Sequence, residues 1–349
     1  MTKVLMKGNE AVGEAAIRAG CKYFFGYPIT PQSEVPEYLA RELPKVGGTF
    51  VQAESEIAAI HMVYGAAGVG KRVMTSSSSP GISLKQEGIT YLAGAELPCV
   101  IVNMMRGGPG LGSIQPSQTD YFQSTRGGGN GDYRTIALAP ASVQEMVELI
   151  MEAFDMADIY RNPVLIVGDG MLGQMMEAVE FKDYKSKDLP EKDWAAVGTG
   201  GKRVPNVINS LYLSADELED HNKKLIKKYD LIKEKEVRVE ELNVEGADLV
   251  ISAFGTTSRI CRSAIAKLEE EGYKVGMIIP ITLWPFPYDS YKDLDAKDVL
   301  VVEMNTGQMI DDVKIGLEGR QKVHFYGRQG GMIPSTEEIY EQAKAILEA

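Results

Sequence analysis

Short apolar runs alternate with helix-like segments along residues 1–170, and this alternation is the feature that most limits the fold. The clearest runs are Pro98–Met105 and Pro163–Val167, which are nearly continuous and apolar. Such runs are typical of strands that are covered on both faces in a parallel sheet. Strands that alternate with helices in this way predict a doubly wound parallel α/β sheet.

A second α/β unit follows a stretch of different character. The chain has 349 residues, and single hydrophobic cores usually stop growing near ~250–300 residues, so we expect two domains. Charged residues dominate segments 182–192 and 216–241, which predicts a linker and a solvated helix. The strand–helix pattern returns at Asp248. The predicted division is a first domain at 1–175, a charged insert at 176–246 and a smaller second α/β domain at 247–349.

Composition excludes several classes of function. The formal net charge of −12 argues against a nucleic-acid partner, since binding phosphates requires a basic surface. Cys21, Cys99 and Cys261 lack metal-cluster spacing, so we expect buried thiols in a reduced compartment. The sequence contains neither a secretory leader nor an apolar run of about 18 residues, and it predicts a cytoplasmic protein without a membrane contact.

The segment Tyr27–Ser33 predicts a turn between a strand and a helix. It follows the aromatic run Tyr23–Phe25 and combines two prolines with two hydroxyl side chains. In a parallel sheet, helix N-termini present free N–H groups at the carboxyl ends of strands, where ligands bind. Thr30 therefore either caps the helix or contacts a ligand.

Three further segments place polar residues after expected strands. Glu54–Glu56 begins a helix, so its carboxylates either complement the helix dipole or have a function. The serine-rich segment Thr75–Gly81 is either a flexible turn or a place where a ligand approaches closely. Arg106 precedes a glycine-rich loop that extends to about Asp132, and loops of this length are usually functional or mobile. The alternative for Arg106 is a surface salt bridge.

Other polar positions favour structural roles. His61 is interpreted as a core histidine with satisfied hydrogen bonds, and Gly255–Ser258 as a plain helix cap. Gly168–Gly170 is similar to the start of the motif that holds Mg-diphosphate in thiamine diphosphate proteins. No asparagine lies at the motif's spacing, where the sequence is Lys192–Gly198, so we interpret the triplet as a turn at a strand end.

These segments together resemble the α subunit of the 2-oxoacid:ferredoxin oxidoreductases over nearly the whole chain except the charged insert. The resemblance rests on their type and order: Tyr27–Ser33, Glu54–Glu56, Thr75–Gly81 and Arg106–Gly110. The detailed sequence is most similar to the branched-chain members, which act on 3-methyl-2-oxobutanoate (2-oxoisovalerate). The segments that carry this finer similarity are Met6–Glu10, Thr30–Val35 and Gln115–Gln118.

The resemblance implies oxidative decarboxylation of a 2-oxoacid, with thiamine diphosphate as cofactor, coenzyme A as acyl acceptor and ferredoxin as electron acceptor. It implies a pyrimidine-type thiamine diphosphate domain followed by a transketolase C-terminal-like domain. Because the diphosphate motif is missing here, it also implies a β subunit that carries this motif and Mg. Further expected partners are iron–sulfur subunits with 4Fe-4S clusters, ferredoxin and a second copy of the assembly, giving a dimer of heteromers.

The family's site residues match three positions of this sequence. Glu56 corresponds to the glutamate that hydrogen-bonds the pyrimidine ring nitrogen, whereas Glu54 cannot share its helical face and is the control position. Thr30 corresponds to a threonine near the 2-oxo group, and Arg106 to the arginine that pairs with the substrate carboxylate. The residues expected to contact the cofactor are Pro28, Ile29, Thr30, Glu56, Ser78, Pro80 and Gly81, and no metal ligand is expected.

Two alternatives remain open at this point. The substrate could be 2-oxoglutarate or pyruvate; a second carboxylate would need another cation, for which Arg126 and Arg134 are the candidates. The chain could instead be a non-catalytic nucleotide-binding or regulatory subunit. Dinucleotide binding is disfavoured, because Gly107–Gly110 carries a proline where a tight turn should donate N–H groups.

Overall fold

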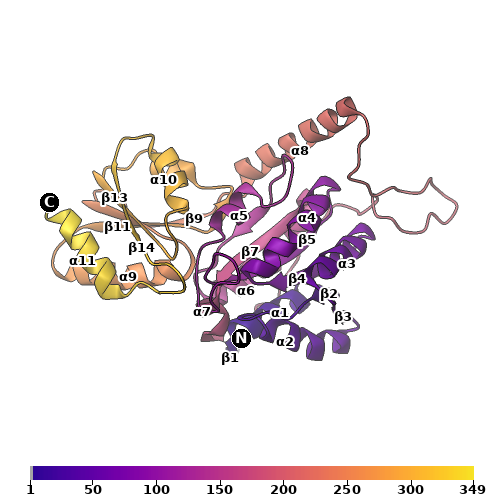
Figure 1. Ribbon diagram of the computed structural model, residues 1–349, viewed down its shortest axis with the longest axis horizontal. Coiled ribbons are helices and arrows are strands. Elements are labelled where there is room, and N and C mark those ends of the chain that lie inside the picture. Colours follow the sequence, from indigo (N-terminus) through magenta and orange to yellow (C-terminus); the bar gives the residue numbers. More distant parts are fainter. Residues whose placement is uncertain (1–2) are drawn as a thin grey trace.

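The computed structural model describes residues 3–349 and contains two α/β domains that lie side by side (Figure 1). The first domain is built on a seven-stranded sheet with the order β12-β6-β7-β5-β4-β2-β3. All neighbours in this sheet are parallel except β12 and β6. Its strands are β2 (Tyr23–Gly26), β3 (Thr49–Gln52), β4 (Val73–Ser77), β5 (Cys99–Met105), β6 (Ile136–Leu138), β7 (Pro163–Asp169) and β12 (Thr282–Trp284).

Helices cover both faces of this sheet, as the doubly wound prediction requires. α1 packs against α2 and α6 on one face, and α3 packs against α4 on the other. The right-handed connection expected between parallel strands accounts for this division and groups α5 with α3 and α4. The elements are α1 (Gly8–Arg18), α2 (Glu34–Glu42), η1 (Leu43–Val46), α3 (Glu56–Gly68), α4 (Ser79–Gly94), α5 (Tyr121–Arg126), α6 (Val143–Tyr160) and α7 (Gly170–Gln174).

The second domain contains a five-stranded sheet with the order β14-β13-β10-β11-β9, in which only β9 is antiparallel to its neighbour. Its strands are β9 (Val239–Leu242), β10 (Leu249–Ser252), β11 (Val275–Pro280), β13 (Asp298–Glu303) and β14 (Lys322–Gly327). Its helices are α9 (Gly255–Glu270), η2 (Tyr288–Tyr291), α10 (Met309–Leu317) and α11 (Thr336–Leu347). β12 lies between β11 and β13 in sequence but pairs with β6 of the first sheet. The chain therefore passes from the second domain to the first and back again.

The charged segment between the domains contributes to the first domain. β8 (Met176–Val179) pairs antiparallel with β1 (Val4–Lys7), and a long loop leads to α8 (Ala215–Lys235). Most of α8 is exposed, as predicted, but it buries Leu225, Tyr229 and Ile232 in the core. Figure 1 shows α8 lying along the first domain, with the preceding loop extending away from it.

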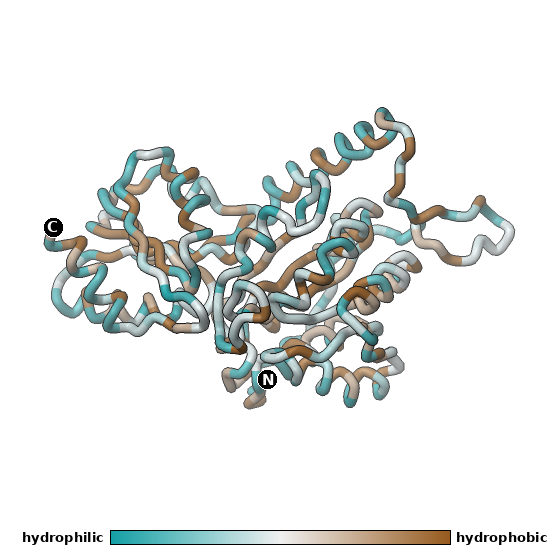
Figure 2. The backbone as a smooth tube through the Cα atoms, viewed as in Figure 1, coloured by the Kyte–Doolittle hydropathy of each residue, from teal (hydrophilic) through white to brown (hydrophobic). Residues whose placement is uncertain are grey.

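Hydrophobic residues concentrate in the central strands of both sheets, whereas α8 alternates between hydrophilic and hydrophobic residues (Figure 2). Cys21, Cys99 and Cys261 are buried free thiols, as predicted, and burial raises the pKa of each. Within residues 3–349, no helix has the length and apolar character needed to cross a membrane.

Candidate active site

The predicted site residues converge where β2, β4 and β5 end and where α3 and α4 begin. These strands are neighbours in one parallel sheet, so their carboxyl ends meet at the same edge. The serine-rich segment is not a flexible turn: residues Ser76 and Ser77 belong to β4, and the side chains of Thr75–Ser79 are buried.

Glu56 is the first residue of α3 and is only 6% exposed. Ser55 caps this helix, because its hydroxyl accepts a 3.1 Å hydrogen bond from the N–H of Ala58. The Glu56 carboxylate is therefore not needed as a cap, and within residues 3–349 it has no hydrogen-bond or ion-pair partner. Glu54 is exposed whereas Glu56 is buried, so the two carboxylates have different surroundings and Glu54 remains the control position.

Gly81 in the first turn of α4 lies directly against this carboxylate. A Cβ atom at position 81 would lie 2.8 Å from Glu56 Oε1 and 2.1 Å from Ser77 Oγ. Only glycine allows the helix to approach Glu56 and the end of β4 so closely.

Several buried polar atoms at this edge of the sheet have no hydrogen-bond partner among residues 3–349. They are Ser77 Oγ, Ser78 Oγ and Gln32 Nε2. A buried polar group without a hydrogen bond raises the free energy of the folded state, and a bound molecule with complementary donors and acceptors removes that cost. The unpaired atoms and the Glu56 carboxylate thus suit a ligand with several hydrogen-bonding groups.

Arg106 joins this edge to the Thr30 turn. Its guanidinium donates hydrogen bonds to the carbonyl oxygens of Thr30 (2.9 Å) and Leu111 (3.1 Å), and its buried Nε has no partner among residues 3–349. The surface salt-bridge alternative is wrong, because Arg106 is 6% exposed and pairs with no carboxylate of the described residues.

Thr30 does not cap the following helix. α2 begins at Glu34, its N-cap residue is Ser33, and the Ser33 side chain forms no cap hydrogen bond within the described residues. Thr30 is exposed, and its hydroxyl forms no hydrogen bond within the described part of the chain, so it is available to a bound molecule.

Asp120 was missed by the sequence reasoning. Its Oδ2 accepts hydrogen bonds from Ser79 Oγ (2.6 Å) and Asn103 Nδ2 (2.9 Å), and burial raises its pKa. Asn103 also accepts a 3.1 Å bond from the Ser79 N–H, so the start of α4 is fixed to the end of β5. The sequence feature that indicates this polar cluster is Asn103, a polar residue inside the otherwise apolar strand β5.

The hydroxyl residues that begin α9 fasten the two domains together, so their interpretation as plain caps is wrong. The Thr256 hydroxyl bonds to Asp169 Oδ2, and Thr257 Oγ1 donates to Gln118 Oε1 at 2.8 Å. Asp169 Oδ1 also accepts the N–H groups of Met171 and Leu172 at 2.9 and 3.2 Å. The predicted turn at Gly168–Gly170 is confirmed, because β7 ends there and α7 begins.

The core interpretation of His61 is also wrong. His61 is exposed on α3, where its Nδ1 lies 2.7 Å from the carbonyl oxygen of Ile57. It points away from the buried face that carries Ile60 and Val63. The helical period places it on the solvent side.

Two cavities open beside the site at the junction of the domains. One, of about 420 Å³, is lined by Ser79, Asp120 and the Gly108–Gly110 loop together with Gln308 of the second domain. The other, of about 670 Å³, lies against Thr30 and has mostly apolar walls. These walls include Pro31, Ile114, Pro116, Met171, Met175 and Ile333.

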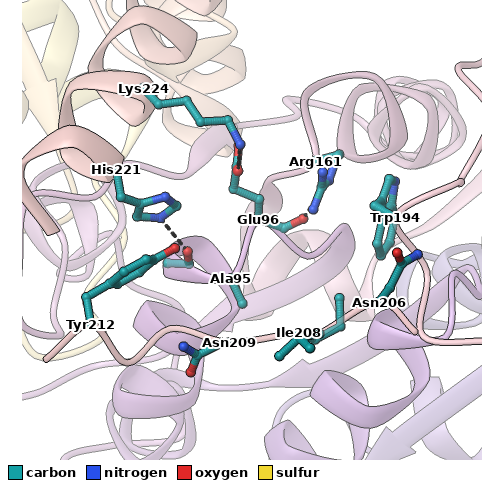
Figure 3. Close-up of a pocket in the computed structure, with 12 residues that line it drawn as sticks. Ala95, Glu96, Arg161, Trp194, Asn206, Ile208, Asn209, Tyr212, His221 and Lys224 are labelled. Atoms are coloured by element: carbon teal, nitrogen blue, oxygen red, sulfur yellow. Dashed lines mark hydrogen bonds and ion pairs between the residues drawn. The ribbon is translucent and has the colours of Figure 1, made fainter. Parts of the chain in front are cut away.

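A third cavity, of about 270 Å³, lies apart from the predicted residues, where α8 and the long loop meet the end of α4 (Figure 3). Two of its charged or polar groups are paired locally: Lys224 with Glu96, and His221 Nε2, which lies 2.7 Å from the Gly94 carbonyl oxygen.

Comparison with known families covers nearly the whole chain. Residues 14–236 match the thiamine diphosphate-binding domain of pyruvate flavodoxin/ferredoxin oxidoreductases, and residues 247–339 match core domain II of pyruvate:ferredoxin oxidoreductase. A ketoisovalerate oxidoreductase subunit VorB from Methanothermobacter thermautotrophicus is 49% identical over 99% of this chain and 98% of the relative. A 2-oxoglutarate synthase subunit KorA from Methanocaldococcus jannaschii is 39% identical over 96% of this chain and 97% of the relative.

Solved structures agree with these matches. The 2-oxoglutarate:ferredoxin oxidoreductase from Magnetococcus marinus, with 2-oxoglutarate, coenzyme A and succinyl-CoA bound, superimposes with a TM-score of 0.89 at 29% identity. The match covers 99% of this chain and 65% of that chain. A split-gene transketolase chain matches with a TM-score of 0.62 at 15% identity over 98% of both chains, which supports the transketolase-like fold alone.

Proposed function

Since this chain belongs to the pyruvate flavodoxin/ferredoxin oxidoreductase family, we propose that it is the catalytic α subunit of an enzyme that oxidatively decarboxylates 3-methyl-2-oxobutanoate. In this reaction coenzyme A accepts the acyl group and ferredoxin accepts the electrons. The observation that carries the catalytic assignment is the buried, unpaired carboxylate of Glu56 beside Gly81 and Ser77.

The residues around Glu56 fit the aminopyrimidine part of thiamine diphosphate. Bound, this cofactor supplies the nucleophilic carbon and accepts the electron pair left when carbon dioxide departs. The Glu56 carboxyl would share a proton with a pyrimidine ring nitrogen. The buried hydroxyls of Ser77 and Ser78, at the end of β4, have no partner among residues 3–349 and would be free to bond to the cofactor. The remaining contacts would come from Pro28, Ile29, Thr30, Pro80 and Gly81.

Arg106 and Thr30 suit the 2-oxoacid. The unpaired Nε of Arg106 leaves its guanidinium able to bind a carboxylate, for which its planar donors are well shaped. The Thr30 hydroxyl could donate to the 2-oxo oxygen. The hydrogen bond from the Arg106 guanidinium to the Thr30 carbonyl oxygen fixes the two residues relative to each other.

A 2-oxoacid with a branched apolar tail fits the site better than one with a second carboxylate. The cavity against Thr30 has apolar walls that include Ile114, Met171 and Ile333. Arg126 already pairs with Asp312 at 3.0 Å, and Arg134 lies beside α8, in a cavity lined by Tyr229 and Trp284. The 49% identical ketoisovalerate oxidoreductase subunit supports the same choice.

Partner subunits complete the proposed enzyme. Among residues 3–349, no group of three or more His, Cys, Asp or Glu side chains could hold a metal ion. We propose that a β subunit carries the Mg-diphosphate site and that iron–sulfur subunits carry the 4Fe-4S clusters that pass electrons to ferredoxin, in a dimer of such heteromers.

The test is 2-oxoacid-dependent reduction of ferredoxin or a viologen dye, with coenzyme A, by this chain co-expressed with its neighbouring subunits. Wild type, E56Q and E54Q are compared on 3-methyl-2-oxobutanoate, pyruvate and 2-oxoglutarate. We expect preference for the branched acid, with activity abolished in E56Q and retained in E54Q. Preference for 2-oxoglutarate would favour the 39% identical 2-oxoglutarate synthase subunit as the functional guide. Absence of turnover by a thiamine-saturated, cluster-loaded complex would favour a non-catalytic subunit.

A further inference from the structure

The loop that follows β5 is tied to the second domain through Gln118. This residue belongs to the first domain in sequence, yet it is fully buried, and within the described part of the chain all its hydrogen bonds are with the second domain. Its Nε2 donates to the Phe254 carbonyl oxygen at 2.8 Å. Its Oε1 accepts from the Thr257 hydroxyl at 2.8 Å and from the Met304 N–H at 3.0 Å. Its backbone N–H donates to Met304, and its carbonyl oxygen accepts from Asn305.

The other end of this loop carries Arg106, and two backbone contacts hold the two ends together. Arg106 pairs with Pro116 in an antiparallel bridge, and the Gly107 N–H donates to the Gln115 carbonyl oxygen at 3.0 Å. Gln118 lies two residues beyond Pro116. One bridge and a short piece of chain therefore connect Arg106 to the second domain.

The second domain also packs directly on the backbone of this loop. A Cβ atom at Gly331 would lie 2.4 Å from the Cβ of Gln115, and one at Gly107 would lie 3.0 Å from the carbonyl carbon of Gly330. Only residues without a side chain allow such an approach. The position of the loop is thus set by contacts with the second domain.

We propose that Gln118 is a positioning residue through which the second domain sets the place of Arg106, and with it Thr30, in the substrate site. The Gln118 amide holds one end of the loop, and the bridge at Pro116 transmits this position to Arg106. The Arg106 guanidinium in turn holds the Thr30 carbonyl oxygen at 2.9 Å. The effect on turnover rests on the proposed function of Arg106, whereas the attachment of the loop by Gln118 does not.

The amide of Gln118 is well suited to this role, because it donates and accepts at the same time. Methionine at this position keeps the length of the side chain and removes both abilities. Q118M therefore leaves the Phe254 carbonyl oxygen, the Thr257 hydroxyl and the Met304 N–H without the partner they now share. A displacement of the loop then moves the groups that bind the 2-oxoacid.

Steady-state kinetics of the chain assembled with its co-expressed neighbouring subunits test the effect on the substrate. In Q118M we expect KM for the 2-oxoacid to rise about 10-fold while kcat changes less than about 3-fold, because the lost interaction binds substrate and transition state alike. An unchanged KM would overturn the proposal.

A double-mutant cycle with R106K tests whether Gln118 acts through Arg106. In the R106K background, Q118M should change kcat/KM by less than about 2-fold, because the group that it positions is already impaired. Effects of the two substitutions that multiply fully would show that Gln118 acts independently of Arg106, and would overturn the proposal.

Hydrogen exchange measures the attachment of the loop without any turnover. The Gly107 N–H, which bonds to Gln115, reports whether the ends of the loop stay together. We expect peptides covering 106–118 to exchange about 10-fold faster in Q118M than in wild type. Equal exchange would overturn the proposal even if the kinetics changed. If the wild-type complex turned over no 2-oxoacid, the proposed function would fail, while faster exchange in Q118M would still support the attachment.

T257V keeps the test decisive if Q118M folds poorly. It removes one of the two donors to Gln118 Oε1 and leaves the amide in place. We expect the exchange of the loop and KM for the 2-oxoacid to change in the same direction as in Q118M, by a smaller amount. A lower KM or slower exchange in T257V would contradict the proposal.

Y121F is the matched control. The Tyr121 hydroxyl also forms a buried hydrogen bond between the domains, to Asp312 at 2.6 Å, but Tyr121 lies in α5, outside the loop. KM and the exchange of the loop should be the same in Y121F as in wild type. An equal effect in Y121F and T257V would show that any weakening of the domain junction is sufficient, and would overturn a specific role for Gln118.

Discussion

Arg106 holds Thr30 through the backbone: its guanidinium donates a 2.9 Å hydrogen bond to the Thr30 carbonyl oxygen, across 76 positions of the chain. The bond joins the end of β5 to the turn after β2, so both proposed substrate contacts belong to one rigid unit. The Thr30 hydroxyl and the Arg106 Nε remain without partners among the described residues. Preorganised groups of this kind lower the entropic cost of placing a substrate.

Replacement of Arg106 by lysine should impair the enzyme strongly. Lysine keeps the charge but loses the planar set of donors that reaches both backbone carbonyls and a carboxylate. We expect kcat/KM for the 2-oxoacid to fall by roughly 10–100-fold, the loss expected for one charge-assisted hydrogen bond. Steady-state kinetics measure this, with R126K as the control, because Arg126 pairs with Asp312 instead. Equal kinetics in R106K and wild type would exclude Arg106 from substrate binding.

An alanine at Gly81 should damage the site locally. The new Cβ would meet Ser77 Oγ at 2.1 Å and Glu56 Oε1 at 2.8 Å, so both groups must move. We expect a loss of about 1–3 kcal/mol of stability and weaker binding of thiamine diphosphate, measured by thermal unfolding and calorimetric titration of the assembled complex. Gly65→Ala is the control, since Gly65 is exposed in α3 and a Cβ there meets nothing within 4 Å. Normal cofactor affinity in Gly81→Ala would contradict the placement of the pyrimidine.

The contact between Thr256 and Asp169 should stabilise the junction of the domains. Asp169 is fully buried, and burial raises its pKa while the Thr256 hydroxyl opposes this. Thr256→Val leaves the carboxyl with one acceptor site unpaired, so we expect a loss of about 1–3 kcal/mol in the free energy of unfolding. Urea denaturation measures it. Ser258→Ala is the comparison, because in the part of the chain that the structure describes the Ser258 hydroxyl bonds only within its own helix, to the Gly255 carbonyl.

The elements with strong local signals were predictable from the sequence. The buried strands β5 and β7 are confirmed. Two helices begin at caps of the kind that a sequence displays: the Ser142 hydroxyl accepts from the Glu145 N–H before α6, and Ser335 and Glu338 form a capping box before α11. The family resemblance and the α/β fold are confirmed by the comparisons. These features depend on short-range patterns, namely apolar runs and capping side chains, which a sequence displays directly.

Features that depend on tertiary neighbours were missed. β12 is too short for a clear pattern and lies next to β6 only because the second domain folds against the first. The hydroxyls at the start of α9 resemble caps in sequence, and their bonds to Asp169 and Gln118 come from another domain. Nothing local distinguishes Lys85 from the exposed lysines of α8, since its burial follows from which face of α4 meets the sheet.

The stability of the chain should depend on pH through Lys85. Burial lowers its pKa to about 7 in the folded state, against 10.5 for an ordinary lysine, so between these values the unfolded state binds more protons than the folded state. Stability then rises with pH from about 7 to about 10 and no longer changes through this group below pH 7. K85M removes the group, so the gain in stability between pH 7 and pH 9.5 should be larger in wild type than in K85M. Chemical denaturation of both proteins at the two pH values measures the difference, and identical gains would show that Lys85 titrates normally in the folded protein.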